Sequence, residues 1–296
     1  MKYTFLSAFL LSSGIIRAQD LKLAGVEYLN YPKVQMKDEA RGNEVSFREF
    51  GAYVNYPIVS KNKRTILING FQYGLVKVTA HSNVSGISTT NNLQGIAYSV
   101  TIVRRWSEKW TVIGRLSPAL ISDFSDKLST NDLALQASVI ATKKIKEGLS
   151  VGGGLVFTSR LGKPLLVPCF QLKYKKNKSV LDIMLPAFIS YTYQLDAKER
   201  LKAGLKVAIS GANFNTGTYN FSRNTEMDQL NYSTTNIGPT ISYQLTNMLQ
   251  VEGSGGLSTM RTYQFYDLQD NQHKYNSKSG AFFKIGLAVT PPKKKS

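Results

Sequence analysis

Apolar and polar positions alternate along most of this chain. In Leu201–Asn213 (LKAGLKVAISGAN), every odd-numbered residue from 201 to 209 is apolar, and lysine, glycine, alanine or serine fills the even positions. A period of two is typical of a β-strand with one apolar face and one polar face. A tilted strand of about ten residues is also long enough to cross a bilayer.

The same pattern recurs from the N-terminal region to the end of the chain. It predicts strands at Leu21–Tyr31, Val45–Ile58, Arg64–Ala80, Leu93–Val103, Trp110–Ser122, Leu133–Ile145, Leu149–Arg160, Leu165–Lys175, Leu201–Asn213, Thr235–Leu245, Leu249–Thr262 and Ser279–Thr290. Ser179–Leu195 contains Pro186, which cannot donate to a strand ladder, so we expect two short strands there. The count is about fourteen, and twelve stays open because a closed barrel of this kind has an even number of strands.

Short and long connections alternate between these segments. We expect long loops at His81–Asn92, Asp123–Asp132, Gly211–Thr234 and Tyr263–Lys278, and short polar turns at the other strand ends. Aromatic residues lie beside the short turns, as in an interfacial girdle: Trp106, Trp110, Tyr174, Tyr193 and Tyr243.

This layout predicts an all-β fold: a transmembrane antiparallel up-and-down β-barrel of 12–14 strands, with short periplasmic turns and longer extracellular loops. The alternative is a soluble β-sandwich or a lipocalin-like cup, whose strands would show a similar pattern. The long strands, the repeat over most of the chain and the aromatic girdle favour the membrane barrel.

The two ends of the chain differ from the barrel pattern. Residues 1–18 have a basic start, an apolar core and Ala18, which predicts a secretory signal peptide and export to the outer membrane of a Gram-negative cell. The barrel is expected at 19–290, followed by a basic tail at 291–296. The single cysteine, Cys169, cannot form an internal disulfide and is expected to pack as a small apolar side chain.

Part of the chain resembles a known family. The run LPAFISYTYQLDAKERLKAGLKVAISGANFN, which ends at Asn215, and NYPI at Asn55–Ile58 resemble an outer-membrane barrel family of Bacteroidota, the domain of unknown function DUF6268. This resemblance implies the fold and the location and brings no catalytic residues. The last strand, with Lys284, Gly286 and Val289, also resembles the signal read by barrel-insertion machinery, although Pro291 stands where a terminal aromatic is usual.

The formal net charge is +18, and its distribution follows the turns. Basic residues gather beside the short turns: Lys61, Lys63, Arg64, Arg104, Arg105, Lys109, Lys143, Lys144, Lys146, Lys175, Lys176, Lys178, Lys198, Arg200 and Lys293–Lys295. They predict a periplasmic rim that is either solvated beside phospholipid head groups or binds an anionic polymer or protein. Export excludes nucleic acid as the expected partner; outer-membrane lipid and, during assembly, the insertion machinery take its place.

The polar faces of the strands identify candidate lumen residues. Alternation points the following side chains inward: Arg115, Gln136, Lys173, Lys202, Lys206, Glu252 and Lys284. Because lysine and arginine outnumber glutamate, a water-filled lumen should favour anions. The alternative is a packed lumen in which these groups form ion pairs and hydrogen bonds.

Candidate catalytic and metal-binding residues are sparse. His81 and Ser82 are adjacent and would point to opposite faces of a strand, and His273 has no companion ligands. Asp123 and Asp126 could help to hold calcium at the surface, but we interpret them as solvated loop charge. The sequence therefore predicts no enzyme, no cofactor and no metal. Two functions remain: a channel for small, anionic solutes, or a closed barrel that binds a partner through its loops or its basic rim.

Overall fold

The computed structural model describes residues 21–37, 42–82, 86, 88–125, 127–158, 165–222, 225–267 and 271–292. The expected signal peptide at 1–18 and most of the basic tail lie outside these ranges. Asp126, one of the two calcium candidates, also lies outside them. No helix in the described ranges is long and apolar enough to cross a membrane.

The described chain is almost entirely β-structure. Its strands are β1 (Ala24–Gln35), β2 (Asn43–Val59), β3 (Thr65–Ser82), β4 (Ser88–Arg105), β5 (Trp110–Ser122), β6 (Leu133–Lys146), β7 (Leu149–Thr158), β8 (Leu165–Lys176), β9 (Ser179–Leu185), β10 (Phe188–Gln194), β11 (Leu201–Ser222), β12 (Thr225–Gln244), β13 (Leu249–Asp267), β14 (Gln272–Asn276) and β15 (Gly280–Val289). A short 3₁₀ turn, η2, covers Thr130–Asp132 before β6.

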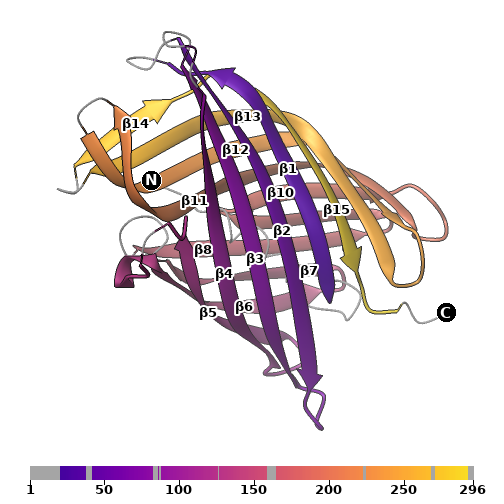
Figure 1. Cartoon of the computed structure of the whole chain (residues 1–296). Coiled ribbons are helices and arrows are strands. Elements are labelled where there is room, and N and C mark those ends of the chain that lie inside the picture. Colours follow the sequence, from indigo (N-terminus) through magenta and orange to yellow (C-terminus); the bar gives the residue numbers. More distant parts are fainter. Residues whose placement is uncertain are drawn as a thin grey trace.

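The strands close into one antiparallel barrel (Figure 1). Each strand from β1 to β12 pairs with the next along the chain, β1 pairs with β15, and the β12–β13 pairing completes the circle. β14 and β15 pair with successive parts of β13, so together they fill one position of the wall. The barrel therefore has fourteen strand positions, which confirms the upper of the two expected counts.

The turns at the two ends of the barrel differ in length. Two-residue turns join β6 to β7 and β8 to β9, whereas the β5–β6 connection includes η2 and is much longer. We call the first side the turn end and the second the loop end. The hairpin of β9 and β10 around Pro186 is also as expected.

Three of the four expected long loops are mostly extended strands, and for them the sequence prediction was wrong; Asp123–Asp132 is a loop as expected. β11 and β12 run on through most of Gly211–Thr234, and β13 and β14 fill much of Tyr263–Lys278. β3 and β4 likewise extend into His81–Asn92. Beyond a membrane both faces of a strand can be polar, so side-chain alternation fades while the backbone ladder continues.

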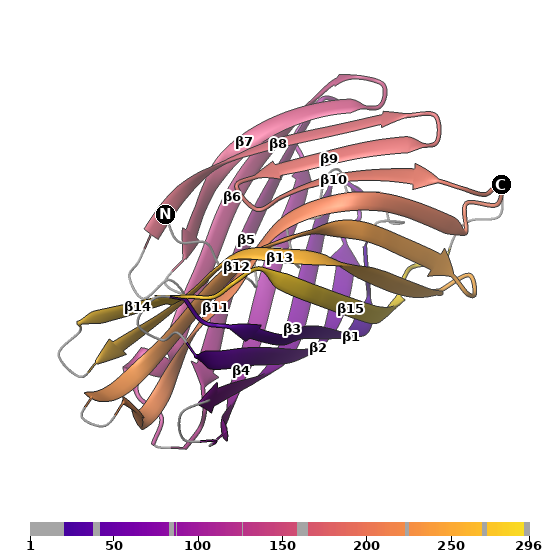
Figure 2. The same cartoon turned by 90° about the horizontal axis from the view of Figure 1, so that it is seen from above.

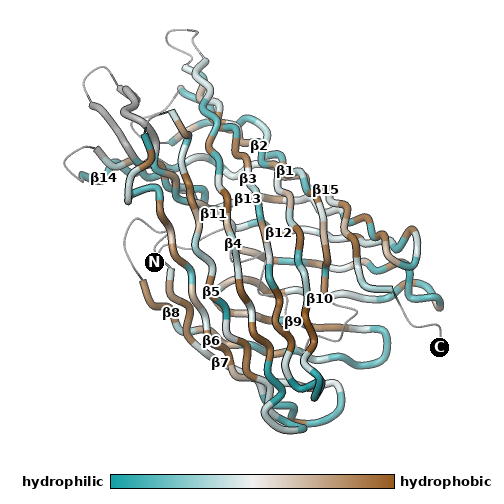
Figure 3. The backbone as a smooth tube through the Cα atoms, turned by 60° about the horizontal axis from the view of Figure 1, so that its bottom comes forward, coloured by the Kyte–Doolittle hydropathy of each residue, from teal (hydrophilic) through white to brown (hydrophobic). Residues whose placement is uncertain are grey.

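The outer face of the barrel is apolar along the strands. In β4, Ile96, Tyr98 and Ile102 are exposed on the outside, while Ala97 and Ser99 are buried inside, as the sequence predicts. Figure 3 shows hydrophilic residues concentrated at the turn tips and hydrophobic residues along the wall. Trp106 and Trp110 lie exposed at the turn end. Each ring makes a cation–π contact: Arg104 Cζ lies 5.9 Å from the centre of the Trp106 ring, and Lys143 Nζ lies 5.5 Å from that of Trp110.

The wall formed by β9 and β10 is shorter than the rest of the barrel. β9 and β10 have seven residues each, fewer than the roughly nine to eleven that a tilted strand needs to cross a bilayer. Their neighbour β11 has 22 residues. The wall between β8 and β11 therefore ends below its surroundings on the loop side, as the β9–β10 hairpin shows in Figure 2.

The interior is packed rather than empty at several levels. The largest apolar cluster joins Phe47 and Leu93 to Phe214, Tyr263 and Phe282, which come from strands on different sides of the barrel. A second cluster centres on Ile140, Met184 and Phe188 and includes Cys169, which packs as the small apolar side chain expected. A third lies at the turn end around Ile68.

An arginine on the outer face of the wall tests whether this face contacts lipid. Leu205 is 63% exposed on the outside of β11, four residues from its turn end. Leu205→Arg should lower the free energy of unfolding by about 2–4 kcal/mol, because a charge near the middle of the bilayer loses its hydration. Urea titration of the barrel in liposomes measures this change.

The matched control is Leu245→Arg in the β12–β13 turn, where the side chain is 46% exposed beside the interface. That substitution should cost about 0–1 kcal/mol. Equal costs at both positions would contradict a bilayer around β11.

Candidate functional site

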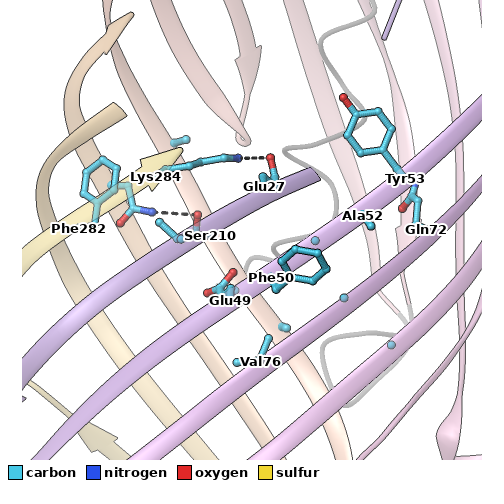
Figure 4. A pocket seen from close by; sticks show the side chains of 18 of the residues that line it. Glu27, Glu49, Phe50, Ala52, Tyr53, Gln72, Val76, Ser210, Phe282 and Lys284 are labelled. Atoms are coloured by element: carbon cyan, nitrogen blue, oxygen red, sulfur yellow. Dashed lines mark hydrogen bonds and ion pairs between the residues drawn. The ribbon is translucent and has the colours of Figure 1, made fainter. Parts of the chain in front are cut away.

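A cavity of about 290 Å³ lies inside the barrel (Figure 4). Its lining comes from β1 to β5 on one side and from β11 to β13 and β15 on the other. Toward the turn end the lining is charged, and toward the loop end it includes Leu29, Val76, Ile121, Phe214 and Phe282. The cavity therefore has one polar region and one apolar region.

Three glycines leave part of the cavity wall without side chains. Gly51, Gly74 and Gly95 are paired across β2, β3 and β4 at one level of the barrel. A Cβ atom at Gly74 would meet no atom within 4 Å, and at Gly95 its nearest neighbours would be 3.8 Å away. The space in front of β3 and β4 exists because Gly74 and Gly95 carry no side chain, whereas the Glu27 side chain lies in front of Gly51, 3.3 Å from where its Cβ would be.

Two ion pairs cross the strands that border the cavity. Lys284 Nζ of β15 lies 2.7 Å from a carboxylate oxygen of Glu27 on β1, as Figure 4 shows. Lys22, just before β1, lies 2.5 Å from Glu252 on β13. All four side chains are partly exposed to the lumen, so solvent screens these pairs and each contributes little to stability on its own.

A hydrogen-bonded network lies deeper in the lumen. Tyr232 Oη donates to Glu49 Oε1 at 2.7 Å, and both side chains are buried. Asn236 Nδ2 donates to Tyr31 Oη at 2.8 Å and to Ser210 Oγ at 3.1 Å. These contacts join β1 and β2 to β11 and β12 through the interior, so they hold together strands that are not neighbours in the wall.

Aromatic rings cover the loop-end side of this network. Phe47 stacks on Tyr263 with ring centroids 5.4 Å apart and tilts against Tyr232 at 4.8 Å. Because these rings belong to β2, β12 and β13, they span the lumen instead of lining one strand. They form the apolar ceiling of the cavity.

Lys206 differs from the other cavity lysines. Its Nζ lies 5.0 Å from the centre of the Phe188 ring, a cation–π contact, and no carboxylate in the part of the chain that the structure describes lies within ion-pair distance of it. It projects from β11 into the same cavity as Glu27, Glu252 and Lys284. Among the described cavity residues, it is the lysine whose charge is not matched by an adjacent acid.

At the loop end, a contact between strands that are not neighbours in the wall crosses the lumen. Asn215 of β11 forms a parallel bridge with Ser122 of β5, although β6 to β10 separate the two strands along the sheet. Asn215 Nδ2 also donates to Asp132 Oδ1 at 3.0 Å, and Asp132 Oδ2 accepts from the Ser129 backbone amide at 2.6 Å. We call the Asp132–Asn215 contact the latch.

Asp132 lies in a connection outside the strands, and its surroundings favour the ionised form. Burial raises the pKa of Asp132, but hydrogen bonds from Ser129, Asn215 and Ser122 outweigh burial and hold this pKa below its usual value of 3.8. The latch is therefore a charge-assisted hydrogen bond at neutral pH.

Three of the seven residues predicted to face the lumen, Lys206, Glu252 and Lys284, line the cavity. The other four lie outside the cavity lining. Lys173 pairs in register with Asp182 on β9, and Lys202 with Ser242 near the turn end. Arg115 of β5 donates to Thr101 Oγ1 at 3.5 Å. Gln136, also expected inward, is buried on β6.

Sequence reasoning missed Lys22, Glu27 and Glu49. The period-two pattern of β1 and β2 places both glutamates inward, so a full count of alternate positions would have found them. With them, the cavity lining holds three lysines and three glutamates. The expected excess of basic over acidic residues is therefore absent at the cavity.

The described residues contain no group of three or more histidine, cysteine, aspartate or glutamate side chains that could hold a metal ion. The cavity instead offers ammonium groups, carboxylates, hydroxyls and apolar surface. This chemistry suits reversible binding of a small molecule.

The sequence matches the domain of unknown function DUF6268 over residues 17–290. The chain belongs to this family. No curated protein sequence matches it. Similar solved structures of this DUF6268 barrel include the COG4313 outer membrane channel from Pseudomonas putida F1, with 11% identity, a TM-score of 0.46 and coverage of 90% of this chain and 94% of that one.

Two further structures are similar to the DUF6268 barrel. The P. putida toluene transporter TodX has 8% identity and a TM-score of 0.45, with 92% and 90% of the two chains covered. The translocator domain of the autotransporter NalP from Neisseria meningitidis has 13% identity and a TM-score of 0.44, with 96% and 93% covered.

The buried network can be tested by removing one hydroxyl. Tyr232→Phe leaves a buried acceptor of Glu49 without its donor, and should lower the free energy of unfolding by about 1–3 kcal/mol, the cost of an unsatisfied buried polar group. Chemical unfolding in lipid, followed by the heat-dependent shift of the folded band on gels, gives this value.

Tyr243→Phe is the control, because Tyr243 is 42% exposed on the outer face. Its effect should stay within about 0.5 kcal/mol. If the two substitutions have the same effect, the Tyr232–Glu49 bond does not help to hold the lumen together.

Proposed function

We propose that this protein is a gated path for small solutes across the outer membrane, closed at rest by the contact between β11 and β5. The Asn215–Ser122 bridge is the observation that carries the proposal, because it crosses the lumen instead of following the wall. The apolar ceiling below it adds a second barrier. The turn end, with its basic side chains, faces the periplasm in this proposal.

The location in the outer membrane is supported by the barrel itself. Its outer face is apolar along the strands and carries aromatic residues at the turn end, as lipid-facing barrels do. A closed sheet also leaves no unpaired strand edge in the hydrocarbon region.

A gate needs a contact that can break without unfolding the wall. The latch meets this condition, because it joins a connection segment to one side chain of β11 and contributes nothing to the ladder of hydrogen bonds around the barrel. The cavity below supplies a place for a solute to rest. A barrel that only seals the membrane would not need a bare glycine surface beside charged side chains in its lumen.

The second candidate function is a closed barrel that binds a partner through its loops or its basic rim. The exposed lysines at the turn end, including Lys61, Lys109 and Lys178, favour this candidate because they form one positively charged end. An anionic periplasmic polymer or protein would be the matching partner. A folded barrel that never conducts would favour this candidate over the first.

Breaking the latch should open the lumen more often. Asp132→Ala removes the acceptor of the Asn215 side chain, and a loss of about 1.4 kcal/mol in the closed state raises the open probability about tenfold. Single-channel recording of the refolded protein in planar bilayers, with a salt gradient to read ion preference, measures this probability.

Asp123→Ala is the matched control, because Asp123 accepts from Ser125 within its own loop. It should leave the open probability unchanged. Steady conductance in the unmodified protein, or no difference between the two variants, would overturn the gate.

Acid should have the same effect as Asp132→Ala. Since the folded state lowers the pKa of Asp132, the stabilising contribution of its carboxylate is complete above its usual value of 3.8 and is lost as the pH falls through the lower value in the folded barrel. The open probability should therefore rise below about pH 4. In Asp132→Asn the same pH range should produce no rise, and a rise of equal size there would assign the effect to another group.

A further inference from the structure

Four of the charged groups around the cavity pair with each other, whereas Lys206 does not. Lys284 pairs with Glu27, and Lys22 pairs with Glu252, so these four groups neutralise one another at short range. Glu49 accepts the hydroxyl of Tyr232 in a buried position. Lys206 remains with an aromatic ring as its contact, and its ammonium group can still accept an anionic partner.

Much of the remaining wall of the cavity on β3 and β4 is apolar or bare, with Gln72 of β3 as a polar neighbour. Gly74 and Gly95 leave a flat surface there, and Val76 and Phe282 continue the apolar lining toward the ceiling. A flat apolar surface matches a planar ring or a short chain. Binding there would remove apolar area from water.

The volume limits the size of the occupant. A cavity of about 290 Å³ corresponds to roughly ten water molecules at about 30 Å³ each, and it is near the lower end of ligand-site volumes. That space fits a ring or short chain with one charged group. It is too small for a lipid with two long chains.

We infer that the cavity binds a small amphipathic monoanion, whose charged group pairs with Lys206 and whose apolar body lies on the glycine surface of β3 and β4. The inference rests on the proposed function, since it names the class of solute that the gated path would hold. It is tested by equilibrium binding, so a barrel that binds but never conducts would support it while contradicting the gate.

Phenylacetate is a suitable probe, with phenylacetamide and phenethylamine as its neutral and cationic counterparts. Calorimetric titration of the refolded full chain in detergent should give a Kd for phenylacetate at least about tenfold lower than for either counterpart, since every 1.4 kcal/mol corresponds to a factor of ten. Lys206→Met should remove this preference, and Lys206→Arg should keep it.

Glycine substitutions distinguish binding in the cavity from nonspecific partitioning into the detergent. Gly74→Leu fills the cavity from a position where an added Cβ has free space, and it should abolish binding of phenylacetate. Gly114→Leu makes the same chemical change in β5, on the opposite face of the wall and again with no atom within 4 Å, and should leave the Kd unchanged.

Three results would overturn the inference: equal affinity for phenylacetate and phenylacetamide, tighter binding of phenethylamine, or binding that survives Gly74→Leu. The last result would identify partitioning into the detergent. If Gly74→Leu does not fold, the contrast between Lys206→Met and Lys206→Arg decides. Loss of binding in Lys206→Met with retention in Lys206→Arg supports the inference, and the same affinity in both refutes it.

Discussion

The closure of the backbone ladder is the constraint on which the rest of this structure depends. A strand in hydrocarbon has no water for its N–H and C=O groups, so each group must find a partner in a neighbouring strand. The β12–β13 and β1–β15 pairings close the circle and remove the free edges. Once the ring is closed, every odd or even position is assigned to lipid or to the lumen, because side chains alternate along a strand.

The lumen follows from that assignment. Inward positions carry large aromatic side chains near the loop end, glycines at the level of the cavity, and charged residues toward the turn end. The aromatic residues meet across the lumen, while the glycines leave space below them. Open and closed regions of the lumen therefore come from the size of the inward residues at each level, and the strand count alone does not decide them.

The interior polar groups explain why a packed lumen can still hold a ligand. Buried polar groups need partners, and Tyr232, Glu49, Asn236, Tyr31 and Ser210 satisfy much of this requirement among themselves. Lys206 is different, because an aromatic ring satisfies its charge only in part. The combination of a rigid network and one under-matched cation is what separates a binding cavity from simple core packing.

The sequence by itself determined the wall of the barrel: the period of two, the turn positions, the β9–β10 hairpin at Pro186 and the inward direction of Lys206, Glu252 and Lys284. These features are local, since alternation and turn chemistry act over a few residues. The tertiary structure decided which inward residues meet. The contacts of Glu27 with Lys284, of Tyr232 with Glu49 and of Asn215 with Asp132 join distant parts of the chain. The strand extensions at the loop end also needed the structure, because backbone pairing continues there without any side-chain pattern to reveal it.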